Sequence, residues 1–174
     1  MFSDITVLIA EDNASDLGTI GQVARSMGFK VITCAEVTQG LQQLEHADIL
    51  MLDLVLANGM ATPLLNMWRA KNRGPVCVLS PEPLKRESSQ IRSIAWNSLV
   101  KPLEVAELRA VLQRYGEYVL LLNRCMAIEI QFGNFKKEME KKFARQMKII
   151  WALLVVIVLI LGGKEAAKIL LPLI

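Results

Sequence analysis

The sequence predicts an open α/β fold in which helices cover both faces of a parallel sheet. Short apolar runs rich in Val and Ile, without polar alternation, indicate strands that are buried on both faces. Between these runs lie longer segments with apolar residues at helical spacing, so five strand–helix units are expected within residues 1–118. This alternation is typical of a doubly wound, five-stranded sheet.

Each expected element follows from its local pattern. The strands are expected at 5–10, 30–34, 48–53, 76–80 and 98–100. The helices are expected at 15–27, 37–45, 62–72, 84–95 and 104–118. In the first helix, an apolar stripe begins at Leu17, and Gly28 follows as a residue typical of helix C-termini.

Polar residues lie at the ends of four of the five expected strands. They are Glu11 with Asp12, Asp53, Ser80 and Lys101. A carboxylate such as Asp53 at the end of a buried strand is costly to desolvate without a partner. Because the functional crevice of an open α/β sheet lies at the carboxyl ends of its strands, these side chains are expected to meet there. Taken singly, each has a structural alternative as a helix cap, a turn residue or an exposed lysine; as a set they indicate a site.

The chemistry of this set favours phosphoryl acceptance. Asp12 and Asp53, with Glu11 acting through water, are expected to bind Mg²⁺, which prefers carboxylate oxygens and keeps several waters. Asp53 is the expected nucleophile, because an ionised aspartate can accept a phosphoryl group as an acyl phosphate. Ser80 and Lys101 are expected to stabilise the charge on the transferring group.

Several other functions are disfavoured. No GxGxxG or P-loop motif follows a strand, which argues against a nucleotide-binding domain. Phosphotransferases of the haloacid dehalogenase type need a second acid two residues after the nucleophile, where this chain has Val55. Residues 1–132 are mildly acidic, so no nucleic acid is expected as a partner. The three cysteines follow no metal-binding spacing and are expected to be small buried residues.

Four segments hold the polar residues in a specific context: "VLIAEDN", "ILMLDL", "VCVLS" and "LVKPLEVAEL". With these segments, residues 1–118 resemble the receiver domain of bacterial two-component response regulators, of the chemotaxis type. The resemblance implies a flavodoxin-like sheet with strand order 2-1-3-4-5. It also implies that Asp53 takes a phosphoryl group from a sensor histidine kinase or phosphotransfer protein. Ser80 would then be the switch hydroxyl, and the carbonyl of Val55 a further Mg²⁺ ligand. Such a receiver signals and is not expected to be an enzyme.

Three positions depart from the receiver pattern. Ser98 stands where the family usually has Tyr or Phe, although Trp96 lies nearby. In the loop "LVLANGMATP", Ala57 occupies the usual proline position, and Pro81 stands where a small residue is typical. The complete acidic site and Lys101 favour signalling by phosphorylation-dependent contact with a downstream protein. The departures favour the alternative, a receiver-like scaffold or localisation protein that does not switch.

A basic helical linker is expected at 119–148. Between residues 133 and 148 it has six Lys or Arg residues and two acidic residues. Apolar residues recur among the lysines at three- and four-residue spacing, namely Phe132, Phe135, Met139, Phe143 and Met147. The pattern fits either a helix that lies on anionic headgroups or a helix that forms a homodimer. Gly133 and Asn134 are expected to form a hinge, with Asn134 as the N-cap of the next helix.

The last segment, 149–174, is expected to be a transmembrane anchor. Its run "IIWALLVVIVLILGG" (149–163) has no charge and is ~22 Å long as a helix, against a hydrocarbon core of ~30 Å. Snorkelling by Lys148 and Lys164 would extend it. The expectation is a single-pass protein of the bacterial inner membrane that contacts lipid and has its receiver in the cytoplasm. The alternative is a buried or coiled-coil helix covered by a partner.

Overall fold

The computed structural model describes residues 2–71, 74–83, 91 and 93–170. It divides into two compact units, Met1–Leu122 and Asn123–Ile174. The boundary falls inside one long helix, α5 (Val105–Leu170).

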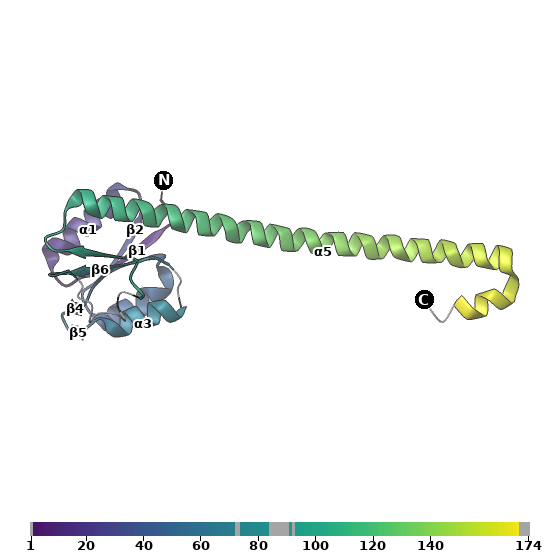
Figure 1. Ribbon diagram of the computed structural model, residues 1–174, viewed down its shortest axis with the longest axis horizontal. Helices are drawn as coiled ribbons and strands as arrows, with labels where there is room; N and C mark the ends of the chain where they lie inside the picture. Colours follow the sequence, from purple (N-terminus) through teal and green to yellow (C-terminus); the bar gives the residue numbers. More distant parts are fainter. Residues whose placement is uncertain (1, 72–73, 84–90, 92, 171–174) are drawn as a thin grey trace. The chain divides into compact units, whose positions relative to one another are not determined.

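The first unit is built on a five-stranded parallel sheet (Figure 1). Its strands are β1 (Thr6–Ala10), β2 (Lys30–Cys34), β3 (Ile49–Asp53), β6 (Val76–Ser80) and β7 (Asn97–Val100). Their order is β2-β1-β3-β6-β7, and all neighbouring pairs are parallel. The predicted sheet and its 2-1-3-4-5 order are therefore confirmed, with β6 and β7 as the fourth and fifth strands.

Helices connect the strands of the sheet. They are α1 (Ala14–Ser26), α2 (Val37–Gln43), the 3-10 helix η1 (Leu44–His46) and α3 (Thr62–Lys71), whereas α5 follows the last strand, β7. At the start of α1, the Asn13 side chain accepts hydrogen bonds from the backbone N–H groups of Ser15 and Asp16. This cap satisfies amides that have no partner inside the first helical turn. Of the helix expected at 84–95, residues 84–90 and 92 lie outside the described residues.

Two apolar cores flank the sheet. Ile9 and Met51 belong to the core that α1 and the first turns of α5 cover. Leu8 and Leu50, their neighbours along the same strands, belong to the core beneath α2 and α3. Figure 1 shows these helices in two layers, with the sheet between them. Successive strand residues point to opposite faces, so burial on both faces explains why the strands lack polar alternation.

The loop after β3 folds into a small antiparallel hairpin that the sequence did not predict. It consists of β4 (Val55–Leu56) and β5 (Gly59–Met60). Gly59 has a φ of 126°, in the left-handed region that favours glycine. The Asn58 side chain accepts a hydrogen bond of 2.9 Å from the backbone N–H of Val37, at the start of α2. The unusual "LANG" sequence therefore forms a turn that is fastened to α2.

Two predictions about the second part of the chain are wrong. α5 is continuous through Gly133 and Asn134, so these residues form neither a hinge nor an N-cap. An interior glycine costs a helix only about 1 kcal/mol, which the good helix formers Lys, Glu and Met on its C-terminal side offset. Cys125 is exposed, whereas Cys34 and Cys77 are buried as expected.

The described residues include no helix that is both long enough and apolar enough to cross a membrane. The predicted transmembrane helix at 149–163 is therefore not supported. Its charge-free run is short because Lys148 and Lys164 bound it. Residues 171–174 of the predicted anchor lie outside the described residues.

Candidate functional site

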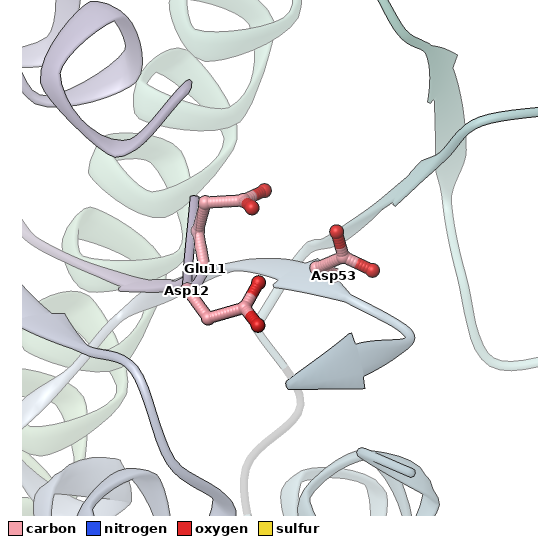
Figure 2. Close-up of side chains that lie close together, drawn as sticks. All are labelled: Glu11, Asp12 and Asp53. Atoms are coloured by element: carbon pink, nitrogen blue, oxygen red, sulfur yellow. The ribbon is translucent and has the colours of Figure 1, made fainter. Parts of the chain in front are cut away.

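Three carboxylates meet at the carboxyl edge of the sheet. Glu11 and Asp12 directly follow β1, and Asp53 is the last residue of the adjacent β3. The strand register pairs Ala10 with Leu52, which brings Glu11 level with Asp53. Figure 2 shows the Glu11 and Asp12 side chains extending to the same side, toward Asp53. One carboxylate oxygen from each residue lies within 4.8 Å of the other two.

The three carboxylates differ in their exposure. Glu11 is fully buried and Asp53 is 7% exposed, whereas Asp12 is exposed. The backbone N–H of Glu11 donates to the carbonyl of Cys34 on β2, which fixes the chain where it leaves β1. Two nearly buried acids beside an exposed third make a site that is open to solvent on one side. A ligand or cation can therefore reach it.

Lys101 neutralises much of this negative charge. Its ammonium Nζ lies 2.5 Å from Oδ2 of Asp53 and 2.8 Å from Oε2 of Glu11. A third carboxylate, that of Asp16 in the first turn of α1, lies 3.1 Å away. Partial burial alone would lower the pKa of Lys101, but hydrogen bonds to Asp53, Glu11 and Asp16 raise the pKa above its ordinary value. The lysine therefore stays charged at all pH values at which the protein is expected to work.

The buried position of Glu11 is unfavourable for a charged carboxylate. Burial raises the pKa of its carboxyl group, and the hydrogen bonds from Lys101 and from the backbone N–H of Asn13 offset this only in part. Its Oε2 is buried and accepts no well-aligned hydrogen bond from the described residues, although it lies at ion-pair distance from Lys101. An under-satisfied buried oxygen beside two further carboxylates suits Mg²⁺, which prefers oxygen ligands. Glu11, Asp12 and Asp53 therefore fit a metal site.

Asp53 is oriented through both of its carboxylate oxygens. Oδ2 contacts Lys101, and Oδ1 accepts a hydrogen bond of 2.9 Å from the backbone N–H of Val55. Val55 itself is 57% exposed at the start of the β4–β5 hairpin. The hairpin thus positions the aspartate side chain from one side while Lys101 holds it from the other.

Ser80 lies at the same edge of the sheet, one strand further along. Leu79 is paired with Asp53 in the register of β3 and β6, so Ser80 lies one residue beyond the aspartate. Ser80 is 8% exposed, and its Oγ accepts a hydrogen bond of 3.4 Å from the backbone N–H of Glu82. Its carbonyl accepts a hydrogen bond from the backbone N–H of Lys101, which ties the end of β6 to the residue after β7. The five polar residues predicted from strand ends thus lie at one edge.

We compared the chain with known proteins. No protein-family model and no curated protein matches it. The signal receiver domain of a putative Luxo repressor protein from Vibrio parahaemolyticus is 17% identical, with a TM-score of 0.63 over 70% of this chain and 96% of that one. The receiver domain of a sensor histidine kinase from Pseudomonas aeruginosa, with a magnesium ion coordinated in its active site cleft, is 26% identical, with a TM-score of 0.58 over 65% and 98%. Chemotaxis protein CheY4 from Vibrio cholerae is 21% identical, with a TM-score of 0.58 over 64% and 98%.

The first unit has the fold of a receiver domain. This fold supports phosphoryl acceptance in general. The Pseudomonas receiver has a magnesium ion coordinated in its active site cleft, and the described residues of this chain include a carboxylate cluster that could hold a metal ion. The match extends over about two thirds of the chain. These comparisons do not extend the receiver interpretation to the whole of α5.

The aromatic residues of the first unit pack in a way that the sequence did not show. Ser98, which the resemblance to receiver domains aligns with a Tyr or Phe, is exposed on β7. Trp96 packs edge-on against Tyr118 of α5, with ring centroids 4.5 Å apart, and against Tyr115 at 6.0 Å. The hydroxyl of Tyr115 donates to the carbonyl of Val76, and burial raises the pKa of this hydroxyl. The Trp96 side chain therefore packs against α5.

Asp16 is the site residue that the sequence interpretation missed. It contacts Lys101 across an interval of 85 residues, and its place in the first turn of α1 brings it to the carboxyl edge of the sheet. The available signal was Asn13: once this residue is recognised as the cap of α1, Asp16 must lie in the turn next to the acidic pair.

Proposed function

We propose that this chain is a response-regulator receiver that accepts a phosphoryl group on Asp53. The donor is the phosphohistidine of a sensor histidine kinase or of a phosphotransfer protein. The observation that supports this most strongly is the environment of Asp53. One oxygen of this nearly buried carboxylate is held by Lys101 and the other by the backbone N–H of Val55, beside two further acids.

The transfer needs one nucleophile and several groups that stabilise charge. A carboxylate oxygen of Asp53 attacks the phosphorus, a P–O bond forms, and the P–N bond of the donor breaks. The electron pair leaves with the imidazole nitrogen, which takes up a proton from solvent. Lys101 is already in contact with Asp53, so its ammonium group can follow the negative charge onto the phosphoryl oxygens. Ser80, one residue beyond Asp53 on the neighbouring strand, would donate its hydroxyl proton to the same oxygens.

Glu11, Asp12 and Asp53, with the carbonyl of Val55, would hold Mg²⁺. When bound, this ion neutralises the negative charge that the phosphoryl group brings into a cluster of carboxylates. The raised pKa of Glu11 bears on this step, because metal binding requires the ionised carboxylate.

The output would be a contact with a downstream protein that depends on phosphorylation. A non-switching scaffold is the second candidate function, and one observation favours it. Ser98 is small, and Trp96 already packs on Tyr115 and Tyr118, so the usual route from the switch hydroxyl to an aromatic residue is altered. Under this alternative, Asp53 would still react with a phosphodonor.

Intact-mass measurement after incubation with Mg²⁺ and acetyl phosphate tests the proposal. The full chain should gain one phosphoryl group, and Asp53→Asn should gain none. Asp48→Asn is the matched control, because Asp48 lies beside the opposite end of β3, where it accepts a hydrogen bond from the backbone N–H of Thr6. A folded Asp53→Asn variant that is still phosphorylated would overturn the assignment.

A further inference from the structure

In the second unit, α5 has an apolar stripe with alternating spacing of three and four residues. It begins with Cys125, Ile128, Phe132, Phe135 and Met139. All five side chains are exposed; Phe132, for example, is 67% exposed. Exposed aromatic and aliphatic side chains in a row are unfavourable in water, so this side of the helix requires a covering surface.

The spacing continues in the same register to Ile160. The next positions are Lys142, Gln146, Ile149, Leu153, Val156 and Ile160. The four apolar members of this group are also exposed. We call the positions from Cys125 to Ile160 in this register the heptad stripe. Apart from Lys142 and Gln146, the heptad stripe is an apolar repeat of seven residues. Such a repeat is typical of helices that supercoil around each other, because an isolated straight helix has 3.6 residues per turn.

The charges beside the heptad stripe suit a second copy of the same helix. We propose that α5 pairs with α5 of another copy of this chain, as a parallel two-stranded coiled coil along the heptad stripe. In such a pair, the residues that directly precede Cys125, Phe132, Met139 and Gln146 flank the interface. Each of them faces the residue of the partner helix that lies five positions later in the sequence. Arg124 then faces Glu129, an attractive pair. The remaining pairs up to residue 150 are Gln131 with Lys136, Glu138 with Phe143, and Arg145 with Ile150.

None of these flanking pairs joins two like charges, although residues 133–148 are strongly basic. Lys137, Lys141 and Lys148 lie on the outer faces of the helix, where a partner helix does not approach them, and Lys136 flanks the interface opposite the uncharged Gln131. Charge repulsion is thus kept away from the interface, apart from Lys142.

Lys142 and Gln146 are the two polar core positions of the heptad stripe. Buried polar residues in a coiled coil fix the register of the two helices at some cost in stability. Glu138 precedes Lys142 by four residues on the same helix, a spacing at which a glutamate and a lysine attract each other. The pair would relieve the repulsion between the two Lys142 side chains. Only in the aligned parallel register do the polar positions meet their own copies.

Cys125 gives a direct test of the parallel arrangement. In an aligned parallel pair, the two copies of Cys125 face each other at a distance that a disulfide bridges, about 5.5–6 Å between Cα atoms. In an antiparallel pair over the heptad stripe, they would lie about 50 Å apart. Mild oxidation of the full chain with oxidised glutathione should therefore produce a covalent dimer on a non-reducing gel. Cys125→Ser should produce none, because Cys34 and Cys77 are buried.

Two isoleucines provide a matched comparison. Ile128 is 63% exposed and belongs to the heptad stripe, whereas Ile130 is 66% exposed and lies on the outer side of the helix. Ile128→Lys should reduce the yield of the covalent dimer at least tenfold, and Ile130→Lys should leave it within about twofold of the wild type.

A lipid surface is the rival partner, and the same variants distinguish it. The probe is flotation with vesicles of phosphatidylglycerol and phosphatidylethanolamine. A chain that stays monomeric by sedimentation, forms no Cys125 crosslink and floats with vesicles would overturn the proposal. Equal loss of the crosslink in Ile128→Lys and Ile130→Lys would also overturn it, because it would indicate nonspecific apolar adhesion. Neither result depends on phosphorylation of Asp53.

Discussion

The ammonium group of Lys101 contacts Asp53 across 48 residues of sequence, at 2.5 Å. This single contact joins the end of β3 to the residue after β7, and so spans three strands of the sheet. It holds the proposed nucleophile beside the cation that would stabilise its phosphorylated form. It also places a fixed positive charge at the site where Mg²⁺ is expected to bind.

Replacing Lys101 by methionine should separate metal binding from phosphorylation. Loss of the ammonium group removes a competing cation from the carboxylates, so Mg²⁺ should bind more tightly, by about tenfold or 1.4 kcal/mol. Phosphorylation by acetyl phosphate should nevertheless become slower, because the phosphoryl group in transfer loses the ammonium group that stabilises its negative charge. Titration calorimetry measures the first effect and intact mass the second. Lys30→Met, at an exposed position on β2, should change neither. Weaker Mg²⁺ binding in Lys101→Met would contradict this account of the site.

Asp16→Asn should affect phosphorylation less than substitutions of Glu11, Asp12 or Asp53. Asp16 is a partly exposed partner of Lys101, and ion pairs of this kind contribute at most about 1 kcal/mol to stability. The free energy of unfolding should therefore fall by less than about 1 kcal/mol, as measured by urea denaturation. Phosphorylation by acetyl phosphate should persist, in contrast to Asp53→Asn. Complete loss of phosphorylation in a folded Asp16→Asn protein would show that this residue belongs to the reacting centre.

Two glycines in α5 should respond in opposite directions to alanine. A Cβ on Gly116 would lie 2.6 Å from Phe2 and 2.8 Å from Phe29, whose rings stack with centroids 4.5 Å apart. The clash in Gly116→Ala should cost about 1–3 kcal/mol of stability. The better helix propensity of alanine offsets about 1 kcal/mol of this cost. Gly133 has open space around its Cβ position, so Gly133→Ala should raise helical stability. Thermal unfolding followed by circular dichroism compares the two, and equal effects would argue against the Phe2–Phe29 contact.

The buried thiols should remain unreactive well above neutral pH. Burial raises the pKa of Cys34 to about 11 and that of Cys77 to about 12. A pKa raised in the folded state means that the folded chain retains a proton that the unfolded chain releases. The associated stability is complete below the ordinary thiol pKa and is lost as pH rises through about 11 to 12. In Cys125→Ser, Ellman's reagent at pH 8 should label two thiols only after unfolding. Rapid labelling of the folded variant would contradict the buried placement.

Binding of a phosphate mimic at Asp53 should change the amide exchange of α5 and β7 only slightly. Ser98 has little apolar area to bury differently, and Trp96 already packs on Tyr115 and Tyr118. A bound group shifts an equilibrium only through its differential interaction with two states. Amide exchange with and without beryllofluoride and Mg²⁺ should therefore show protection in the loops after Asp53 and Ser80. Large changes across residues 93–115 would contradict the weak switch.

The sequence was sufficient for the sheet and for most of the site, because both depend on local patterns. Apolar runs define the strands, and the polar residues at their ends must share one edge of a parallel sheet. Asp16 was missed because its contact depends on how α1 sits against the residue after β7, which no local pattern reports. The β4–β5 hairpin depends similarly on the contact between Asn58 and α2. The hinge expected at Gly133 failed because a single glycine is a weak signal inside a strongly helical segment.

The central claim is that Asp53 is the residue that takes the phosphoryl group. Borohydride reduction converts an aspartyl phosphate into homoserine, which tandem mass spectrometry can locate by residue. The full chain should be treated with acetyl phosphate in the presence and absence of Mg²⁺, reduced and digested. We expect homoserine at position 53, and only when Mg²⁺ is present. Homoserine at Asp12 or Asp16, or at position 53 in equal yield without Mg²⁺, would contradict the account of the site.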